Sequence, residues 1–445
     1  MGAGARSLLK RLEAFKSNGW QAPLYDPDAG FQGSRHILSS DAAPVSTEER
    51  VQVMDVLRGV ALFGVFLMNL APFAGAPIMA TEQQLLSLPT AGYDFALLDV
   101  LRWLVMDKAN TMFAFLFGLG FYLQMRRVES RGVDFERLYK RRLTVLLAFG
   151  VVNLFFLWTW DILHLYALAG FILLPLRRLS TRDLLGIGLI LALLGRTGEK
   201  ALAEFAPAGN WLGLPGGYSD ADILLRQKLS ESGDYFALVA NFFDWVFIDY
   251  LASGMILGWL CYALGRFLIG AWVGRHGWIT RAREYMPGWR RVRNWGLLAG
   301  LIFEGLAVIL SEASWLPEWE HREFYAECIH FITVPVLAAG YVAAIVVGFE
   351  SGRLRRWLAP FAWAGRMALT NYLVQGLVIG FVLFGVGPGL ALAGRAGTCL
   401  MAGIALGGYA LQMLFSRWWL SRFAYGPAEW LWRTLTYGKL AGRSE

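Results

Sequence analysis

Apolar runs long enough to cross the hydrocarbon core of a lipid bilayer recur along this 445-residue chain, and clusters of Arg and Lys separate many of them. The chain is 56% hydrophobic and only 17% charged, with a mean hydropathy of +0.44, whereas a soluble protein needs more charge to cover its surface. Many of its 19 Trp residues stand at the ends of apolar runs, where an indole ring suits a membrane interface. These features predict an all-α fold, a polytopic transmembrane helix bundle in a lipid bilayer.

The apolar runs amount to about ten membrane spans, five in each half of the chain. The loop after the first run lacks Lys and Arg, whereas the connections at 126–142 and 266–293 are rich in Arg. Because cytoplasmic connections carry the excess of positive charge, this bias predicts that both the N- and C-termini are cytoplasmic. The predicted spans are 57–74, one within 93–125, 143–158, 162–176, 184–194, 250–269, 295–310, 326–348, 361–384 and 398–415.

Four segments follow from this map. Residues 1–50 are predicted to form a cytoplasmic tail without a cleavable signal peptide, because they contain no continuous apolar stretch. Residues 51–195 hold the first five spans, 196–235 form an extracytoplasmic loop, and 236–438 hold the last five spans with an interfacial C-terminal helix. No internal repeat of the kind found in inverted-repeat transporters is evident.

The charge and cysteine content exclude two classes of function. The formal net charge is +7, but the basic residues are scattered between apolar runs and form no single face, so nucleic acid is not an expected partner. Cys261, Cys328 and Cys399 stand alone in apolar stretches, without the paired spacing of a metal site. We therefore expect no metal and no covalently bound cofactor.

His164 follows Asp161 by one helical turn at the start of a predicted span. At this spacing a carboxylate can hold the imidazole tautomer and raise its basicity, which is how a general base is built. The alternative is structural: Asp161 caps the helix and His164 makes one interhelical hydrogen bond.

Several cationic residues are candidates for donor or anion binding. Asp55 and Arg58 lie one turn apart at the start of the first span, where they could hold phosphates or simply satisfy one another. Lys108 stands at a predicted helix break, where it could meet an anion or extend to the interface. Arg366 begins a polar stripe that continues through Asn371 and Gln375, which could line a tunnel or bind neighbouring helices.

Other ionisable or polar groups fall inside predicted spans, where each costs free energy unless it is paired or faces a water-filled cavity. Asn69 lies in the first span and Glu304 in the seventh. Glu327 and His330 are one turn apart near the outer end of the eighth, which predicts a pair. Glu304, Glu327 and His330 are candidates for proton handling or for an acceptor site.

Five strings, in this order and spacing, resemble the YeiB-like family of bacterial membrane proteins, whose C-terminal half is a domain of unknown function. The resemblance covers about residues 52–438 and implies a bacterial cytoplasmic (inner) membrane protein. The strings are Met54-Asp-Val-Leu-Arg-Gly-Val-Ala-Leu-Phe-Gly64 with Asn69, the Lys108 segment ending Phe115-Leu-Phe-Gly118, Trp160-Asp-Ile-Leu-His-Leu-Tyr-Ala-Leu-Ala-Gly170, Gly365-Arg-Met-Ala-Leu-Thr-Asn-Tyr-Leu-Val-Gln375 and Tyr425-Gly-Pro-Ala-Glu-Trp-Leu-Trp-Arg-Thr-Leu-Thr-Tyr437.

The opening string is also similar to that of transmembrane acyltransferases, including the lysosomal enzyme that acetylates terminal glucosamine. That enzyme has its catalytic His after the first span, whereas this chain has no His between Asn69 and Asp107. The leading hypothesis is an acyltransferase that takes an acyl group from a cytoplasmic donor, with acyl-CoA as the possible donor substrate. The acceptor would be an envelope glycan, a lipid or a small molecule.

In this hypothesis Arg58 and Arg366 grip donor phosphates, and His164, oriented by Asp161, deprotonates the acceptor. Asn371 or Asn69 would donate a hydrogen bond to the developing oxyanion. Two alternatives stay open. One is a permease for a small anionic or amphipathic solute, with protons carried by Asp161, Glu304 and His330. The other is a non-catalytic subunit of a membrane complex, with a homo-oligomer or another membrane protein as partner.

Overall fold

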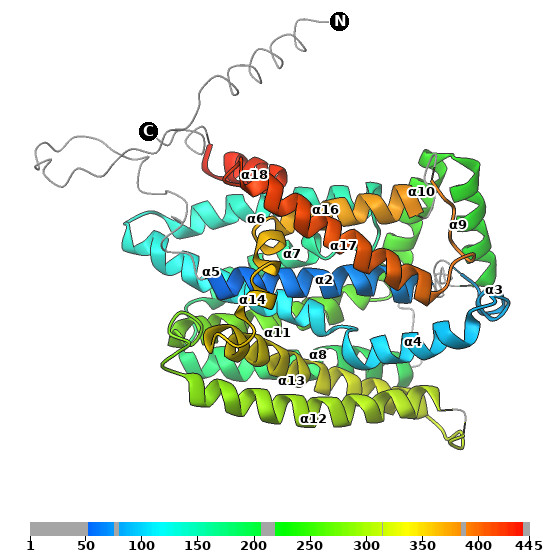
Figure 1. Cartoon of the computed structure of the whole chain (residues 1–445), viewed down its shortest axis with the longest axis horizontal. Coiled ribbons are helices and arrows are strands. Elements are labelled where there is room, and N and C mark those ends of the chain that lie inside the picture. The colour runs from blue at the N-terminus through cyan, green and yellow to red at the C-terminus, as the bar shows by residue number, and fades with distance from the viewer. Residues whose placement is uncertain (1–51, 75–79, 206–218, 314, 384–388, 439–445) are drawn as a thin grey trace, which may run out of the picture. The chain divides into compact units, whose positions relative to one another are not determined.

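The computed structural model describes residues 52–74, 80–205, 219–313, 315–383 and 389–438. The described residues belong to one compact unit, 40–445, and their regular elements are all helices (Figure 1). The tail predicted at 1–50 lies outside them. The helices are α2 (Gln52–Ala74), α3 (Glu82–Leu86), α4 (Ala91–Leu104), α5 (Lys108–Ser130), α6 (Phe135–Phe156), α7 (Leu163–Leu176), α8 (Thr181–Phe205), α9 (Asp220–Ser232), α10 (Tyr235–Trp245), η1 (Val246–Ala252), α11 (Met255–His276), α12 (Met286–Glu312), α13 (Arg322–Glu350), α14 (Arg355–Leu358), α15 (Phe361–Arg366), α16 (Ala368–Leu377), η2 (Val378–Leu383), α17 (Thr398–Leu420) and α18 (Pro427–Tyr437).

Six helical segments of the described chain are long and apolar enough to cross a membrane, fewer than the ten spans predicted. Two further apolar helical segments, 163–176 and 368–383, are shorter. The two remaining predicted spans fall on α6 and α8. Charged residues occupy the first turns of α6 and the last turns of α8, and they shorten the apolar part of each helix. The six segments are Gln52–Ala71, Ala91–Ser130, Met255–His276, Met286–Glu312, Arg322–Glu350 and Thr398–Leu420.

The segment predicted as an extracytoplasmic loop, 196–235, contains helical structure. Helix α8 continues through Arg196 to Phe205, and α9 occupies Asp220–Ser232. Ser219 caps α9 through a capping box with Asp222, which explains where this helix begins.

Helix α12 shows which surface the bundle presents outward. Its large apolar side chains are exposed, whereas Gly296, Gly300, Glu304 and Ala307 are buried against α13 and its neighbours. The two helices lie side by side along the lower edge of Figure 1. A soluble helix buries its apolar face, so this reversed pattern is the one expected of a helix in contact with lipid. The exposed residues include Trp295, Leu298, Ile302, Phe303, Leu306 and Ile309.

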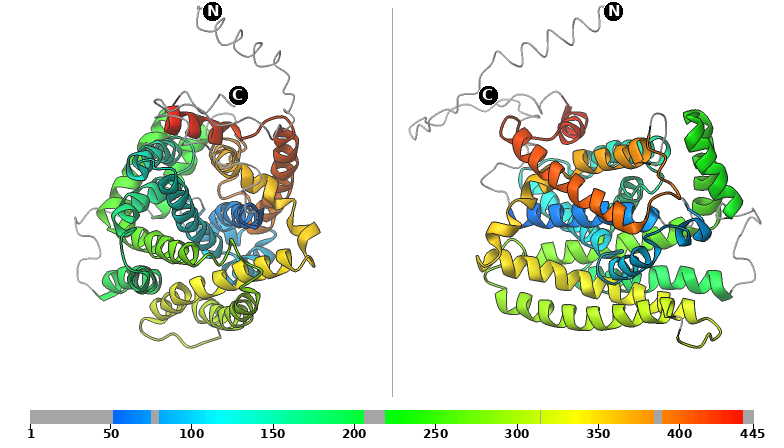
Figure 2. Two further views of the ribbon diagram at one scale, coloured as in Figure 1. Left: turned by 90° about the vertical axis from the view of Figure 1, so that its left-hand side faces the viewer. Right: turned by 45° about the vertical axis from the view of Figure 1, so that its right-hand side comes forward.

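Helix α2 lies inside the bundle, with most of its side chains buried, and packs against α5, α15 and α17 (Figure 2). Two glycines allow its close contact with α15. A Cβ on Gly59 would lie 2.0 Å from the Phe361 carbonyl oxygen, and one on Gly365 would lie 1.9 Å from the Asp55 carbonyl oxygen. This backbone contact fixes the start of α2 against the end of α15, which brings the neighbourhoods of Arg58 and Arg366 together.

Three interruptions in the helices place polar residues inside the bundle. Asp107, with a left-handed φ of 62°, separates α4 from α5. A six-residue connection, 157–162, separates α6 from α7. Met367 separates α15 from α16, and leaves the first amides of α16 without partners in their own helix.

We predict that Gly59→Ala destabilises the protein, because the new methyl group meets backbone that cannot rotate away. Overpacking of this kind costs about 1–3 kcal/mol or more. Gly407→Ala in α17 is the matched control, since a Cβ there meets nothing within 4 Å. Thermal unfolding in detergent, followed by size-exclusion chromatography, should show a lower midpoint for Gly59→Ala only. Equal midpoints for the two variants would contradict the close contact between α2 and α15.

Candidate active site in two adjoining cavities

Two cavities inside the bundle share part of their walls. The larger has a volume of about 380 Å³ and is called here the basic cavity. The smaller has a volume of about 220 Å³ and is called the histidine cavity. Both are lined by Val65, Asn110, Ile162 and Tyr372, so the cavities adjoin one another in the middle of the bundle.

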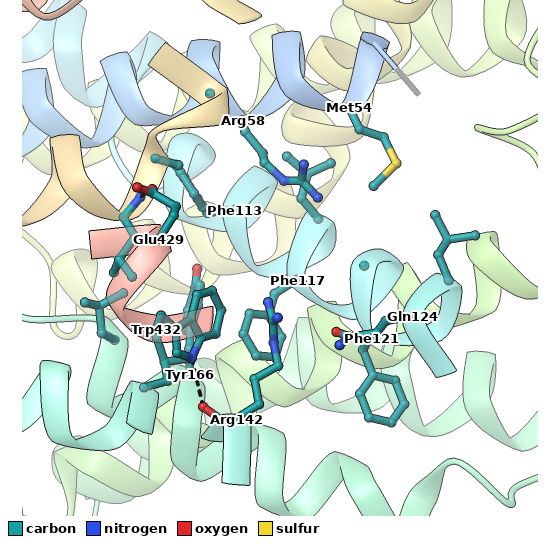
Figure 3. A pocket seen from close by; sticks show the side chains of 18 of the residues that line it. Met54, Arg58, Phe113, Phe117, Phe121, Gln124, Arg142, Tyr166, Glu429 and Trp432 are labelled. Atoms are coloured by element: carbon teal, nitrogen blue, oxygen red, sulfur yellow. Dashed lines mark hydrogen bonds between the residues drawn. The ribbon is translucent and has the colours of Figure 1, made fainter. Parts of the chain in front are cut away.

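Arginines dominate the charge of the basic cavity. Arg58 extends into it from α2 and Arg142 from α6, as Figure 3 shows. Arg58 also forms an ion pair with Asp55, with 2.8 Å between Nη1 and Oδ1. Such a concentration of guanidinium groups is suited to phosphates or carboxylates. The arginines that line the cavity are Arg58, Arg127, Arg131, Arg142, Arg366 and Arg433, and the acids are Asp55 and Glu429.

Between the arginines and the shared wall, the basic cavity is largely apolar. Phe113, Phe117 and Phe121 follow one another at helical spacing on α5 and line it, with Tyr166 of α7 nearby (Figure 3). Phe117 stacks on Phe267, with 4.5 Å between ring centroids, which fixes its orientation. The cavity therefore combines a charged end with an apolar, aromatic passage.

Asp161 and His164 line the histidine cavity as a hydrogen-bonded pair. Asp161 Oδ2 accepts from the backbone N–H of His164 at 2.8 Å and lies 2.8 Å from its Nδ1. Asp161 Oδ1 accepts from Asn153 Nδ2 at 2.8 Å and from the Tyr372 hydroxyl at 3.4 Å. The carboxylate therefore both caps the first turn of α7 and holds the imidazole, so the two sequence-based readings of this residue are compatible.

These contacts fix the tautomer of the neutral imidazole. Because an ionised carboxylate only accepts, His164 Nδ1 carries the hydrogen and Nε2 of the neutral ring is left as an acceptor. The Tyr250 hydroxyl lies 3.0 Å from Nε2 and donates to it. Tyr250 belongs to the π-helical segment η1, a geometry that is frequent at functional sites. His164 is thus arranged to accept a proton at Nε2.

Lys108, Glu304 and His330 do not line either cavity but form one buried ionic cluster with Asp107. Glu304 Oε2 lies 3.1 Å from Lys108 Nζ and 3.0 Å from His330 Nδ1. The other ring nitrogen of His330 lies 3.1 Å from Asp107 Oδ2. Asp107 is the member of the cluster that lines the histidine cavity. Since Lys108 is paired in this way, its predicted role in binding a donor anion is not supported.

The predicted pair between Glu327 and His330 is replaced by other contacts. Glu327 instead binds Lys200 of α8, with 2.6 Å between Oε1 and Nζ. A one-turn spacing allows such a pair, but the carboxylates of Asp107 and Glu304 lie on both sides of the imidazole.

The predicted polar stripe on span nine is divided between two environments. Arg366 lines the basic cavity. Asn371 donates to the Ala364 carbonyl and to Ser416 Oγ, and Gln375 donates to Gln412, so both bind neighbouring parts of the bundle. Asn371 lines neither cavity, which argues against an oxyanion role for it. Asn69 lines the histidine cavity.

Sequence analysis missed several residues that complete the site. Asn110 lies on the wall that the cavities share, and Asn153, Tyr250 and Tyr372 orient the Asp161–His164 pair. Asn110 belongs to the family-like string that begins at Lys108, and this is the sequence feature that points to a functional role for it. The sequence around Arg142 predicts only a cytoplasmic charge, because an Arg-rich connection does not distinguish a lining residue from a topology signal.

Glu429 of α18 lines the basic cavity, where its side chain is partly buried. Burial raises its pKa above the usual range for a glutamate, although hydrogen bonds from Thr370 and Leu369 act in the opposite direction.

Among the described residues no group of three or more His, Cys, Asp or Glu side chains could hold a metal ion.

Comparison with known proteins places this chain in a family. Residues 273–439 match a family model described as a protein of unknown function, DUF418. Uncharacterized protein YxaH of Bacillus subtilis is 31% identical, over 89% of this chain and 97% of the relative. Uncharacterized protein YeiB of Escherichia coli is 30% identical, over 87% of this chain and 96% of the relative. An uncharacterized 39.9 kDa protein of Bacillus acidopullulyticus is 27% identical over 89% and 96%.

The relatives thus match this chain over nearly their whole lengths and come from bacteria. The helices of the described chain are those of a multi-pass membrane protein. The chain belongs to the YeiB-like family of bacterial membrane proteins that carry the DUF418 domain.

Proposed function

We propose that this protein is a membrane acyltransferase that uses an acyl-CoA-like donor. The observation that carries the proposal is the shared wall between an arginine-lined cavity and a cavity that holds an oriented Asp–His pair. Acyl transfer from a thioester needs a site for an anionic carrier, a passage for its arm and a base near the reacting carbonyl. The two cavities offer these three features in that order.

The donor would enter through the basic cavity. Arg58 and Arg366 line this cavity and would bind its phosphates, together with the arginines on α5, α6 and α18. The aromatic passage along Phe113 and Phe117 suits an uncharged, flexible arm. The thioester would then lie near the shared wall, close to Asn110.

In the proposed reaction, His164 acts as a general base through Nε2. An acceptor hydroxyl or amine attacks the thioester carbonyl while Nε2 takes its proton, and the imidazolium returns that proton to the departing thiolate. Asn110 or Asn69, which line the histidine cavity, would donate to the tetrahedral oxyanion. Asp161 keeps Nδ1 protonated and stabilises the imidazolium. Because Tyr250 binds Nε2, the acceptor must displace this hydroxyl or hydrogen-bond in its place.

The same proposal includes the finer topology. Ten spans with both termini in the cytoplasm would put the basic cavity at the cytoplasmic face of the bacterial inner membrane, since Arg127, Arg131 and Arg142 belong to an Arg-rich connection. The histidine cavity would then open toward the outer half, where a glycan, lipid or small-molecule acceptor is reached.

One observation favours a second candidate function, proton-coupled transport. The buried cluster of Asp107, His330, Glu304 and Lys108 adjoins the histidine cavity, and such intramembrane ionisable groups also occur in proton-driven permeases. Counterflow of a solute in proteoliposomes without any acylated product would favour this function over acyl transfer.

We predict that His164→Ala lowers acyl transfer by about 10²–10⁴-fold, the usual contribution of a general base. The measurement is transfer of radiolabel from acetyl-CoA to endogenous acceptors in inverted membrane vesicles. His321→Ala is the control, because His321 lies at the start of α13, pairs with Glu204 and lines neither cavity. A His164→Ala protein as active as the wild type would exclude this histidine as the base.

We predict that Arg58→Ala weakens binding of coenzyme A by about 10–100-fold, as expected for loss of one charge-assisted phosphate contact. Arg281→Ala is the control, since Arg281 is exposed and outside both cavities. Isothermal titration of the purified protein in nanodiscs measures both. If the two variants bind coenzyme A alike, Arg58 has no part in donor binding.

We predict that Ser130 and Ser232, both exposed, lie on opposite sides of the membrane. In a background without Cys261, Cys328 and Cys399, a membrane-impermeant maleimide should label Ser232→Cys in intact spheroplasts. Ser130→Cys should react only after permeabilisation. Labelling of both positions in intact spheroplasts would refute the ten-span map.

A further inference from the structure

Helix α18 is fastened to three other helices by side chains on the face that lines the basic cavity. Trp432 Nε1 donates to the Arg142 carbonyl at 3.0 Å, and the Arg142 guanidinium lies 3.7 Å from the centre of the Trp432 ring (Figure 3). Gln124 Nε2 donates to the Tyr437 hydroxyl at 3.1 Å. The third contact, from Glu429 to α16, is the most specific.

Glu429 caps the helix that begins after the Met367 break. Its Oε1 accepts from the backbone N–H of Leu369 at 2.7 Å and of Thr370 at 3.1 Å, and Oε2 accepts from the Thr370 hydroxyl at 2.5 Å. The backbone N–H of Ala428 in turn donates to Thr370 Oγ1 at 3.0 Å. A carboxylate at a helix N-terminus satisfies unpaired amides and is favoured by the helix dipole. The first turns of α16 and α18 therefore hold each other in place.

The helical turn of α16 that Glu429 caps is followed by Tyr372, which lines the histidine cavity. Tyr372 lies two residues after Thr370, and its hydroxyl accepts from the backbone N–H of Ile162 at 3.0 Å. The same hydroxyl donates to Asp161 Oδ1. About one helical turn therefore separates the residues that bind Glu429 from the residue that orients the Asp161–His164 pair.

We propose that Glu429 is a positioning residue that couples α18, at the basic cavity, to the Asp161–His164 pair through α16 and Tyr372. A donor that binds Arg433 on the next turn of α18 would tighten this connection and align the base. The inference deepens the proposed acyltransfer and, in its donor-dependent part, rests on it. The mechanical part, from Glu429 to Asp161, concerns the protein alone.

Membrane attachment by itself would not require a glutamate that is hydrogen-bonded to α16. Helix α18 also exposes Trp430, Leu431 and Leu435, which are sufficient for an interfacial anchor. A carboxylate that is partly withdrawn from water costs free energy unless its hydrogen bonds are made, and Glu429 makes them with the first turn of α16. Its contacts therefore indicate a role in holding α16.

Hydrogen–deuterium exchange tests the mechanical part without any ligand. In Glu429→Ala, we expect exchange to rise by about tenfold or more in peptides covering 368–377 and 159–166, as lost buried hydrogen bonds would produce. Glu429→Gln should lie between this variant and the wild type, because its carbonyl can still accept from the two amides. Leu435→Ala, on the exposed face of α18, is the matched control and should match the wild type. Faster exchange at 368–377 with no change at 159–166 in both Glu429 variants would overturn the proposal.

Added coenzyme A tests the donor-dependent part. In the wild type it should slow exchange at 159–166, and Glu429→Gln should lose this effect. The affinity of this variant for coenzyme A should change less than about threefold, since a carboxylate does not bind a phosphate. With acetyl-CoA as donor, kcat should fall and KM should change little. Protection of 159–166 to the same extent in Glu429→Gln would overturn the coupling. If the wild type fails to bind coenzyme A at all, the proposed function fails, whereas the ligand-free exchange experiment still decides the link between Glu429 and Asp161.

Discussion

The cost of placing an ionisable group inside an apolar bundle organises this structure. Each such group must be paired or must face a cavity, because lipid and packed side chains offer no water. Lys108, Glu304 and His330 meet this requirement by pairing with one another and with Asp107. Arg58, Arg366 and His164 lie at a cavity wall, where Arg58 also pairs with Asp55 and His164 with Asp161. In the proposed function the second group carries the chemistry, and the first holds α5, α12 and α13 together beside it.

Helix breaks explain how polar residues reach these positions. A continuous span satisfies its own backbone and offers few donors or acceptors, whereas each interruption releases amides and turns side chains inward. The break before α7 lets Asp161 bind both the backbone and the ring of His164. The break before α16 receives Glu429 from α18. The two breaks are joined by the Tyr372 hydroxyl, so the basic end of the bundle and the histidine cavity share one set of contacts.

The sequence predicts the all-helical class, the positions of most helices and the Asp161–His164 pair, because these depend on apolar run length and on contacts within one helical turn. It does not predict partners across helices. Spacing alone suggested a pair between Glu327 and His330, yet α8 and α12 supply the partners of these residues. Asn371 is polar, as a residue that lines a cavity would be. Its hydrogen bond to Ser416 depends on how α16 is rotated about its axis, which the sequence does not show. Tyr250, in a π-helical segment, gave no local pattern to follow.

The most direct measurement of this account is a cryo-electron microscopy map of the protein in nanodiscs with a non-hydrolysable thioether analogue of acetyl-CoA. The account predicts nucleotide density among Arg58, Arg142 and Arg433, an arm that follows Phe113 and Phe117, and an acyl group beside Asn110 within reach of His164. Density for the analogue elsewhere, or a basic cavity occupied by an ordered lipid that the analogue does not displace, would contradict it.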